Sequence, residues 1–105
     1  MISREDFVFT IGYDGATAIV DGKAKRAYGK LGTMELAEKG LYRAAFASAL
    51  FAQAPQATGA AGRDDDMRAF IAFFNGKAGT SYTKAEELKR LFGVNEEAVT
   101  RVLVL

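Results

Sequence analysis

Residues 7 to 20, FVFTIGYDGATAIV, decide the fold because they place a tight-turn signal between two alternating apolar runs. Asp14-Gly15 lies between the runs, and a two-residue hairpin loop needs residues that tolerate positive φ at both central positions. With this dipeptide as the loop, Ile11 would face Ala18 on the apolar side of the hairpin. The stretch therefore predicts an N-terminal β-hairpin with one buried face.

Residues 98 to 105, AVTRVLVL, are another strongly β-forming segment. Five of the eight residues are Val or Leu, and β-branched side chains favour sheet over helix. An isolated two-stranded hairpin is marginally stable in water, so the N-terminal hairpin needs a partner for its apolar face. We expect this segment to be a C-terminal strand that joins the hairpin and completes a small antiparallel or mixed sheet.

The C-terminal region also resembles the helix-turn-helix of bacterial repressors, which leaves a second interpretation open. The resemblance covers AEELKRLFGVNEEAVTRVL and rests on the apolar positions, the turn and the cap, namely Leu88, Leu91, Gly93, Val94, Asn95, Val99 and Val102. It implies a second helix whose first residues approach the bases in the major groove. Glu96 and Glu97 stand at those positions, and carboxylates there oppose contact with phosphates. We therefore favour the strand, with a nucleic-acid-binding protein as the alternative function.

A long central helix is predicted between Thr33 and Pro55. Thr33 is a suitable N-cap, good helix formers follow it, and Pro55 ends the pattern. The second half of this helix is apolar nearly all round, which is typical of a helix in the centre of a domain or in an oligomer interface. Gly40 and several alanines would let a neighbouring element approach closely.

Two short helices are predicted after the central one. Asn75-Gly76 would close the first in a left-handed conformation. Thr83 and Glu86 have the spacing of a capping box at the start of the second, and Gly93 would end it. The buried face of the second would consist of Leu88, Leu91 and Phe92.

These elements predict one globular α+β domain over residues 1 to 105. Its parts would be an N-terminal β-hairpin, a long central helix, two short helices and a C-terminal strand that completes a small sheet. The chain is long enough for one hydrophobic core and too short for two independent ones.

Three adjacent carboxylates, Asp64, Asp65 and Asp66, raise the question of a cation site. Calcium loops alternate their ligands along the chain, and no such Asp-x-Asp-x-Asp-Gly pattern is present. Carboxylates ahead of a helix instead cap its free amides and complement its dipole. We therefore expect no bound metal, and we interpret the run as the start of the first short helix.

Cysteine and histidine are both absent from the sequence. Their absence removes disulfides, thiolate nucleophiles, Cys/His zinc sites and the commonest general base near neutral pH. The remaining polar residues show no spacing typical of a catalytic motif or of a phosphate-binding loop. We expect no catalytic residue, no enzyme activity and no cofactor.

The segment GKAKRAYGK, residues 22 to 30, gathers cations around an aromatic side chain. The candidate anion or nucleic-acid patch consists of Lys23, Lys25, Arg26, Tyr28 and Lys30. A charge run of this kind is more often a solvated edge strand or loop, and the net charge of +1 gives no overall attraction to nucleic acid. We expect a loop or edge strand here, and nucleic acid is possible as a partner but not favoured.

Surplus apolar surface on so short a chain indicates self-association and a protein partner. The candidate interaction surface consists of Phe46, Leu50, Phe73 and Phe74. No apolar run approaches the roughly twenty residues of a membrane span, and the first residues lack the pattern of a secretory signal. We therefore expect a small non-enzymatic interaction or scaffold module, cytoplasmic and homodimeric, with no membrane partner.

Overall fold

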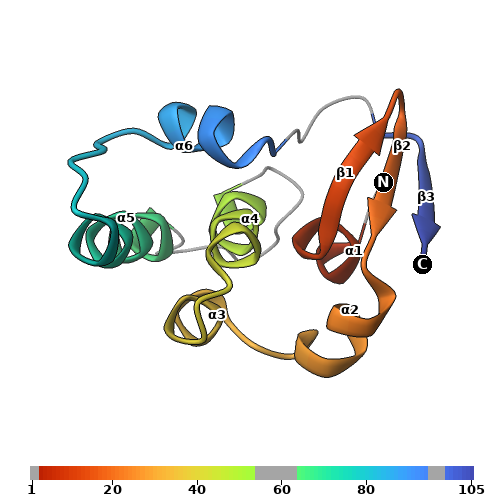
Figure 1. The fold of residues 1–105 in the computed structure, drawn as a ribbon, viewed down its shortest axis with the longest axis horizontal. Coiled ribbons are helices and arrows are strands. Elements are labelled where there is room, and N and C mark those ends of the chain that lie inside the picture. The colour runs from red at the N-terminus through yellow and green to blue at the C-terminus, as the bar shows by residue number, and fades with distance from the viewer. Residues whose placement is uncertain (1–2, 54–63, 95–98) are drawn as a thin grey trace.

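A computed structural model describes residues 3–53, 64–94 and 99–105 of the chain. In chain order its elements are α1 (Arg4–Val8), β1 (Thr10–Asp14), β2 (Thr17–Val20), α2 (Gly22–Tyr28), α3 (Thr33–Glu38), α4 (Tyr42–Gln53), α5 (Asp64–Ala78), α6 (Ala85–Phe92) and β3 (Arg101–Val104). Figure 1 shows α3 to α6 on one side of the molecule and the sheet on the other, with α1 between the strands and α4. The predicted α+β fold with an N-terminal hairpin and a C-terminal strand is confirmed.

The sheet has the order β1-β2-β3 and is mixed, because β2 pairs antiparallel with β1 and parallel with β3. The register of β3 runs from Thr17 opposite Arg101 to Val20 opposite Val104. The helix-turn-helix interpretation needs a helix that reaches Val102, so it is wrong for this segment. Residues 95–98, which would begin that helix, lie outside the described residues.

The hairpin loop differs from the prediction by one residue. Asp14 pairs with Thr17, so the two-residue loop is Gly15-Ala16 and not Asp14-Gly15. Gly15 has a φ of 58°, which suits the first central position of such a loop. Asp14 is therefore the last residue of β1.

A β-bulge in β1 reverses the side-chain alternation. The register shifts between Thr10 and Gly12, which leaves Ile11 without a partner on β2. Ile11 is 56% exposed, whereas Thr10 is buried and its hydroxyl donates to the Asp6 carbonyl at 2.6 Å. The predicted pairing of Ile11 with Ala18 on the buried face is wrong, because the shifted loop places Tyr13 opposite Ala18 and the bulge then turns the Ile11 side chain outward.

Two short helices, α1 and α2, flank the hairpin where none was predicted. Ser3 is the N-cap of α1, since its Oγ accepts a hydrogen bond from the Asp6 amide at 3.3 Å. Asp21 is the N-cap of α2, and its Oδ1 accepts a hydrogen bond from the Ala24 amide at 3.1 Å. The loop or edge strand predicted after Asp21 is therefore wrong, because the Asp21 side chain caps a helix instead of shaping a turn.

The predicted long central helix is two helices, α3 and α4, separated at Gly40. Gly40 has a φ of 81°, a left-handed conformation that any residue with a Cβ adopts at a cost. The Leu41 amide donates to the Leu36 carbonyl, and the Gly40 amide donates to the Ala37 carbonyl, both at 3.0 Å. These two bonds form a Schellman motif, which ends α3 and turns the chain into α4.

The predicted cap at Asn75-Gly76 is wrong, because α5 continues through both residues and ends at Ala78, just before Gly79, where φ is 69°. The Asn75 side chain has a different role. Its Nδ2 donates to the Tyr82 carbonyl at 2.8 Å, and its Oδ1 accepts from the Tyr82 amide and the Thr80 hydroxyl at 3.0 and 2.8 Å. These bonds hold the connection between α5 and α6.

The predicted capping box of Thr83 and Glu86 is wrong, because the residue at the N-cap of α6 is a lysine, whose side chain cannot accept a hydrogen bond from a helix amide. Lys84 is the N-cap, and Glu87 Oε1 accepts from the Thr83 and Lys84 amides at 3.2 and 3.1 Å. The backbone bonds from Thr83 and then Lys84 lower the pKa of the Glu87 carboxyl below its ordinary value. The predicted end at Gly93 is confirmed, with φ at 64°.

The core between α4, α5 and α6 is built largely from aromatic rings. Phe46 and Phe70 are fully buried, and the Phe92 ring lies 5.5 Å from that of Phe46. Leu88 is also fully buried, as predicted, whereas Leu91 is 50% exposed. Because residues four apart share a helix face, Leu88 and Phe92 lie on the core side of α6 and Leu91 lies away from it.

Two glycine-to-alanine substitutions should change stability in opposite directions. Gly76→Ala is expected to raise the free energy of unfolding by about 0.5–1 kcal/mol, because alanine favours the interior of a helix. A Cβ at Gly76 would meet no heavy atom within 4 Å. Gly40→Ala is expected to lower the same free energy by about 1–2 kcal/mol, because it puts a Cβ in the left-handed region. Urea denaturation followed by circular dichroism measures both, and a loss at Gly76 would contradict the bounds of α5.

Candidate interaction surface

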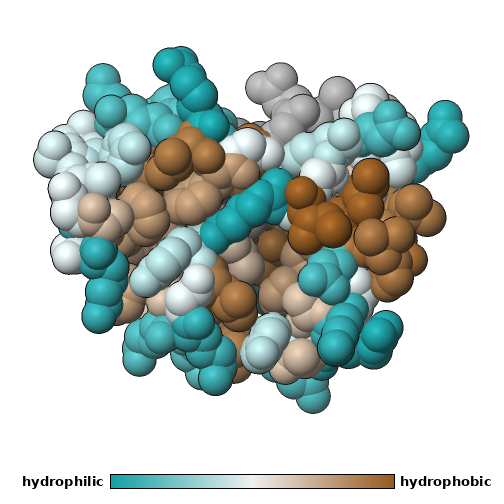
Figure 2. Space-filling model, viewed as in Figure 1, coloured by the Kyte–Doolittle hydropathy of each residue, from teal (hydrophilic) through white to brown (hydrophobic). Residues whose placement is uncertain are grey.

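Most of the exposed large apolar side chains among the described residues belong to the sheet. They are Ile11 at 56%, Val102 at 38%, Leu103 at 52%, Val104 at 46% and Leu105 at 66% exposed. Figure 2 shows hydrophobic side chains gathered over the strands at the right of the view. We call residues 102–105, together with the free backbone side of β3, the β3 edge.

Both faces of β3 carry apolar side chains. Partners on adjacent strands point to the same face, so Val102 and Val104 share the face of Ala18 and Val20, which are fully buried. Leu103 points to the opposite face. Because α1 contacts β2 and β3 is the outermost strand, the side chains of β3 stay exposed on either face.

The backbone of the β3 edge has hydrogen-bonding groups that face away from the sheet. The Arg101 amide donates to the Ala16 carbonyl at 3.2 Å, and the Leu105 amide donates to the Val20 carbonyl of β2 at 2.9 Å. Alternate residues of a strand direct these groups to opposite sides, so the N–H and C=O groups of Val102 and Val104 point outward. Natural edge strands usually carry lysine, proline or a bulge, whereas Arg101 is the only charge in β3. No strand of the described part of the chain pairs with this side of β3, so the β3 edge has the groups needed to pair with another strand.

The structure divides the predicted basic patch. Lys25 is half-buried and its Nζ forms an ion pair with Asp6 Oδ1 at 2.6 Å, while Tyr28 packs against the core. The cations that stay exposed are Lys23, Arg26 and Lys30. They lie along one side of α2 and just beyond its end, without the aromatic ring that the prediction placed among them.

The predicted apolar interaction surface lies mostly inside the molecule. Phe46, Leu50 and Phe74 are buried, at 0%, 4% and 8% exposure, where they pack in the core. Phe73 is half-buried, and Lys77 Nζ lies 5.6 Å from the centre of its ring. Three of the four residues are therefore core residues, because α5 and α6 cover the face of α4 that the sequence left without a partner.

An apolar cavity of about 420 Å³ opens between the hairpin, the α3–α4 connection and the end of α6, and Arg43 lines it. Arg43 Nε donates to the Phe92 carbonyl at 2.9 Å and Nη2 to the Gly93 carbonyl at 3.3 Å. Burial lowers the pKa of Arg43, although a guanidinium stays protonated at neutral pH. The Arg43 guanidinium therefore caps the C-terminus of α6.

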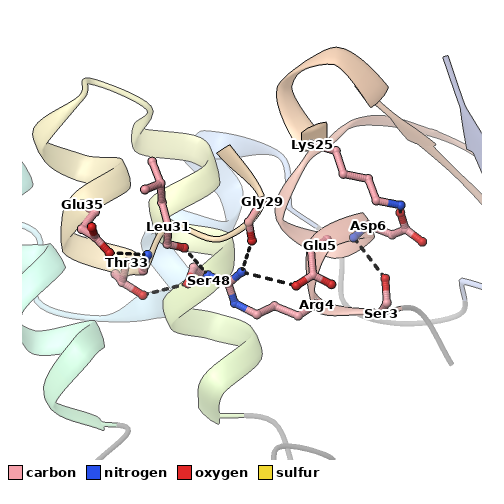
Figure 3. A network of polar contacts seen from close by, with 11 residues as sticks. Ser3, Arg4, Glu5, Asp6, Lys25, Gly29, Leu31, Thr33, Glu35 and Ser48 are labelled. Carbon is pink, nitrogen blue, oxygen red and sulfur yellow. Dashed lines mark hydrogen bonds and ion pairs between the residues drawn. The ribbon is translucent and has the colours of Figure 1, made fainter. Parts of the chain in front are cut away.

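A polar network joins α1, the α2–α3 connection and α4 (Figure 3). Arg4 donates to the carbonyls of Gly29 and Leu31, at 3.1 and 2.7 Å, and to Ser48 Oγ at 3.0 Å. The Arg4 guanidinium therefore satisfies acceptors from segments that are far apart in the sequence. Its function is to hold α1 and the start of α3 against α4.

Among the residues that the structure describes, the side chains bonded to Ser48 are donors, and none is a base. The Ser48 Oγ accepts from Arg4 and also from the buried Thr33 hydroxyl, 2.9 Å away. Activation of a serine needs a group that takes its proton, which neither partner does. Thr33, predicted to cap the central helix, is instead the first residue of α3 and follows Gly32 as N-cap. These are the contacts of a structural network.

Within residues 3–53, 64–94 and 99–105, no three His, Cys, Asp or Glu side chains gather as metal ligands would. The predicted acidic run forms the first turn of α5, although the side chains of Asp64 and Asp65 lie outside the described part. Over the same ranges, no helix is both long and apolar enough to cross a membrane.

The fold is thus a helical α+β domain with a mixed three-stranded sheet that ends in an open apolar strand. No family model, curated protein or solved structure matches the chain.

Sequence reasoning identifies β3 as a strand but not as a site. Its run of Val and Leu has no polar alternation, which is also typical of a central strand buried on both faces. The position of the strand at the end of the sheet depends on contacts with β2, and no local pattern encodes it.

Proposed function

We propose that this protein is a non-enzymatic interaction module that binds an extended polypeptide segment at the β3 edge. The observation that carries this proposal is the combination of outward N–H and C=O groups with exposed apolar side chains on both faces of the strand. In strand addition the main-chain hydrogen bonds supply affinity, and alternate side chains supply specificity. The bound segment would continue the sheet beyond β3.

The chemistry of the remaining surface supports a polypeptide partner. Among the exposed cations of α2, Arg26 lies near the end of the β3 edge, because Gly22 packs against the Arg26 guanidinium and against Val104 and Leu105. Within β3 itself, Arg101 is the only charge. An apolar edge of this kind favours an uncharged, extended segment over a polyanion, because nucleic-acid binding depends on several phosphate contacts. The absence of histidine and cysteine, together with the donor-only surroundings of Ser48, supports the non-enzymatic part of the proposal.

A peptide-binding assay tests strand addition at the β3 edge. The probe is a fluorescein-labelled peptide of sequence VTRVLVL, and fluorescence anisotropy measures its dissociation constant from the intact protein. Val102→Pro is expected to weaken binding by about tenfold or more, because proline removes an outward amide that the peptide needs. Proline at this position leaves the β2–β3 bonds in place, since the Val102 amide does not face β2.

Two controls make the assay specific. Val102→Thr keeps the amide and the β-branched shape, so its affinity should stay within about threefold of the parent protein. Leu91→Ala removes an exposed apolar side chain from α6 and should have no effect. Equal affinity for the Val102→Pro and Val102→Thr variants would show that the peptide binds elsewhere.

A further inference from the structure

We infer that the segment bound at the β3 edge is the β3 strand of a second copy of this chain, in antiparallel orientation about a two-fold axis at Leu103. This inference rests on the proposed function, because it names the occupant of the same edge. Three features support it. The outward backbone groups of β3 match those of an inverted copy, and the single charge of the strand, Arg101, does not meet a second Arg101. The apolar side chains on each face of β3 would also lie beside apolar side chains of the second copy.

The open backbone groups of β3 match those of an inverted copy. Only Val102 and Val104 direct their N–H and C=O groups outward, and they lie on either side of Leu103. In an antiparallel pair, residues directly opposite each other alternate between hydrogen-bonded and non-hydrogen-bonded positions. With the axis at Leu103, Val102 of one copy exchanges both hydrogen bonds with Val104 of the other. Every outward group of the strand between these valines then has a partner.

The side chains agree with this register. Leu103 meets Leu103 of the second copy on one face, and each Val102 lies beside a Val104 on the other. Arg101 falls opposite Leu105 of the second copy, so the two positive charges do not face each other. Like charges directly opposite on neighbouring strands destabilise a sheet, and this register avoids them.

A shift of the axis by one residue, from Leu103 to Val102, is less favourable. An axis at Val102 leaves both Val104 residues without their hydrogen-bonded partner and places Arg101 beside Leu103 of the second copy. Since unpaired backbone groups next to a new strand lose water without gaining a partner, the Leu103 axis is the register that the edge favours.

The sequence allows a clean cross-linking test because it contains no cysteine. Leu103→Cys places the two introduced thiols opposite each other at a non-hydrogen-bonded position, where the Cβ separation suits a disulfide. Leu105→Cys places them several residues apart, beyond the reach of a disulfide. Under mild oxidation of the intact protein, the Leu103→Cys dimer should form about tenfold faster or more than the Leu105→Cys dimer. Leu91→Cys, on α6, is the control for random collision.

Sedimentation velocity gives the second readout. The parent protein should show a concentration-dependent dimer, and Val102→Pro should raise the dimer dissociation constant by about tenfold or more while Val102→Thr leaves it nearly unchanged. Circular dichroism confirms that each variant is folded. Equal cross-linking of the Leu103→Cys, Leu105→Cys and Leu91→Cys variants would overturn the register, and a strictly monomeric parent protein would overturn self-pairing.

These outcomes separate the inference from the proposed function. A monomeric protein that still binds VTRVLVL in a manner sensitive to Val102→Pro would contradict self-pairing and retain strand addition, with another protein as the donor. A monomer that binds the peptide equally in all variants would contradict both. A dimer unaffected by Val102→Pro, without Leu103→Cys cross-linking, would place the interface elsewhere on the molecule.

Discussion

Phe70→Ala is expected to lower the free energy of unfolding by about 3–5 kcal/mol. Phe70 is fully buried, and its ring centre lies 6.0, 5.8 and 6.3 Å from those of Phe46, Phe74 and Phe92. Removal of the ring leaves a cavity where α4, α5 and α6 meet. Since small domains have a total stability of about 5–15 kcal/mol, urea denaturation should show a large loss or an unfolded chain at room temperature.

Phe73→Ala is the matched control for this substitution on the same helix. Phe73 is only half-buried, and its ring contacts the Lys77 ammonium at the surface. We expect a loss of about 1–2 kcal/mol, in proportion to the smaller area that the side chain buries. Equal losses at Phe70 and Phe73 would contradict the orientation of α5 relative to α4 and α6.

Arg4→Met is expected to lower the free energy of unfolding by about 2 kcal/mol, because hydrogen bonds from a charged donor contribute more than neutral ones. The substitution keeps much of the aliphatic volume but leaves the carbonyls of Gly29 and Leu31 and the Ser48 oxygen without the guanidinium. The figure is at the lower end of the usual range, because the Arg4 side chain is 30% exposed and water can replace part of what is lost. Thermal denaturation measures the change.

Lys30→Met tests whether loss of a positive charge alone lowers the free energy of unfolding as much as Arg4→Met does. Lys30 is exposed at the end of α2, close in sequence to the carbonyls that Arg4 binds. We expect a change within about 0.5 kcal/mol, as for most surface substitutions. A similar loss in both variants would attribute the effect to net charge, and a smaller loss for Arg4→Met than for Lys30→Met would contradict the network of Figure 3.

Local patterns predict most of the sheet and little of what surrounds it. The alternation in residues 10–20 and the Val- and Leu-rich segment at 98–105 both encode extended structure in neighbouring residues, which is why the strands could be predicted. Phe7 and Val8, predicted to belong to the first strand, lie instead in α1. The bulge at Ile11 could not, because it depends on which residues of β1 are held by α1 and β2. Helices as short as α1 and α2 contain too few residues for a periodic signal, and their caps at Ser3 and Asp21 also suit turns.

The candidate site is harder to predict than the fold for a related reason. Apolar residues such as Phe46 and Phe74 look equally suited to a core or to an interface until the packing of α5 and α6 is known. The exposure of Leu103 follows from strand order, which is a property of the whole chain. Composition does not tell which apolar side chains are exposed, and only tertiary structure places most of the large exposed ones at the β3 edge.

The parallel pairing of β2 with β3 also has a consequence for the order of folding. Thr17 pairs with Arg101, so nearly the whole chain forms the loop that this contact closes. Closing a loop costs conformational entropy before the contact it forms stabilises the chain. Folding therefore slows as contacts join residues that are more distant in the sequence. The helices can therefore assemble early, whereas β3 is expected to dock late. The chain thus spends part of its folding time with β2 as the temporary outer strand and its apolar C-terminal segment still unpaired.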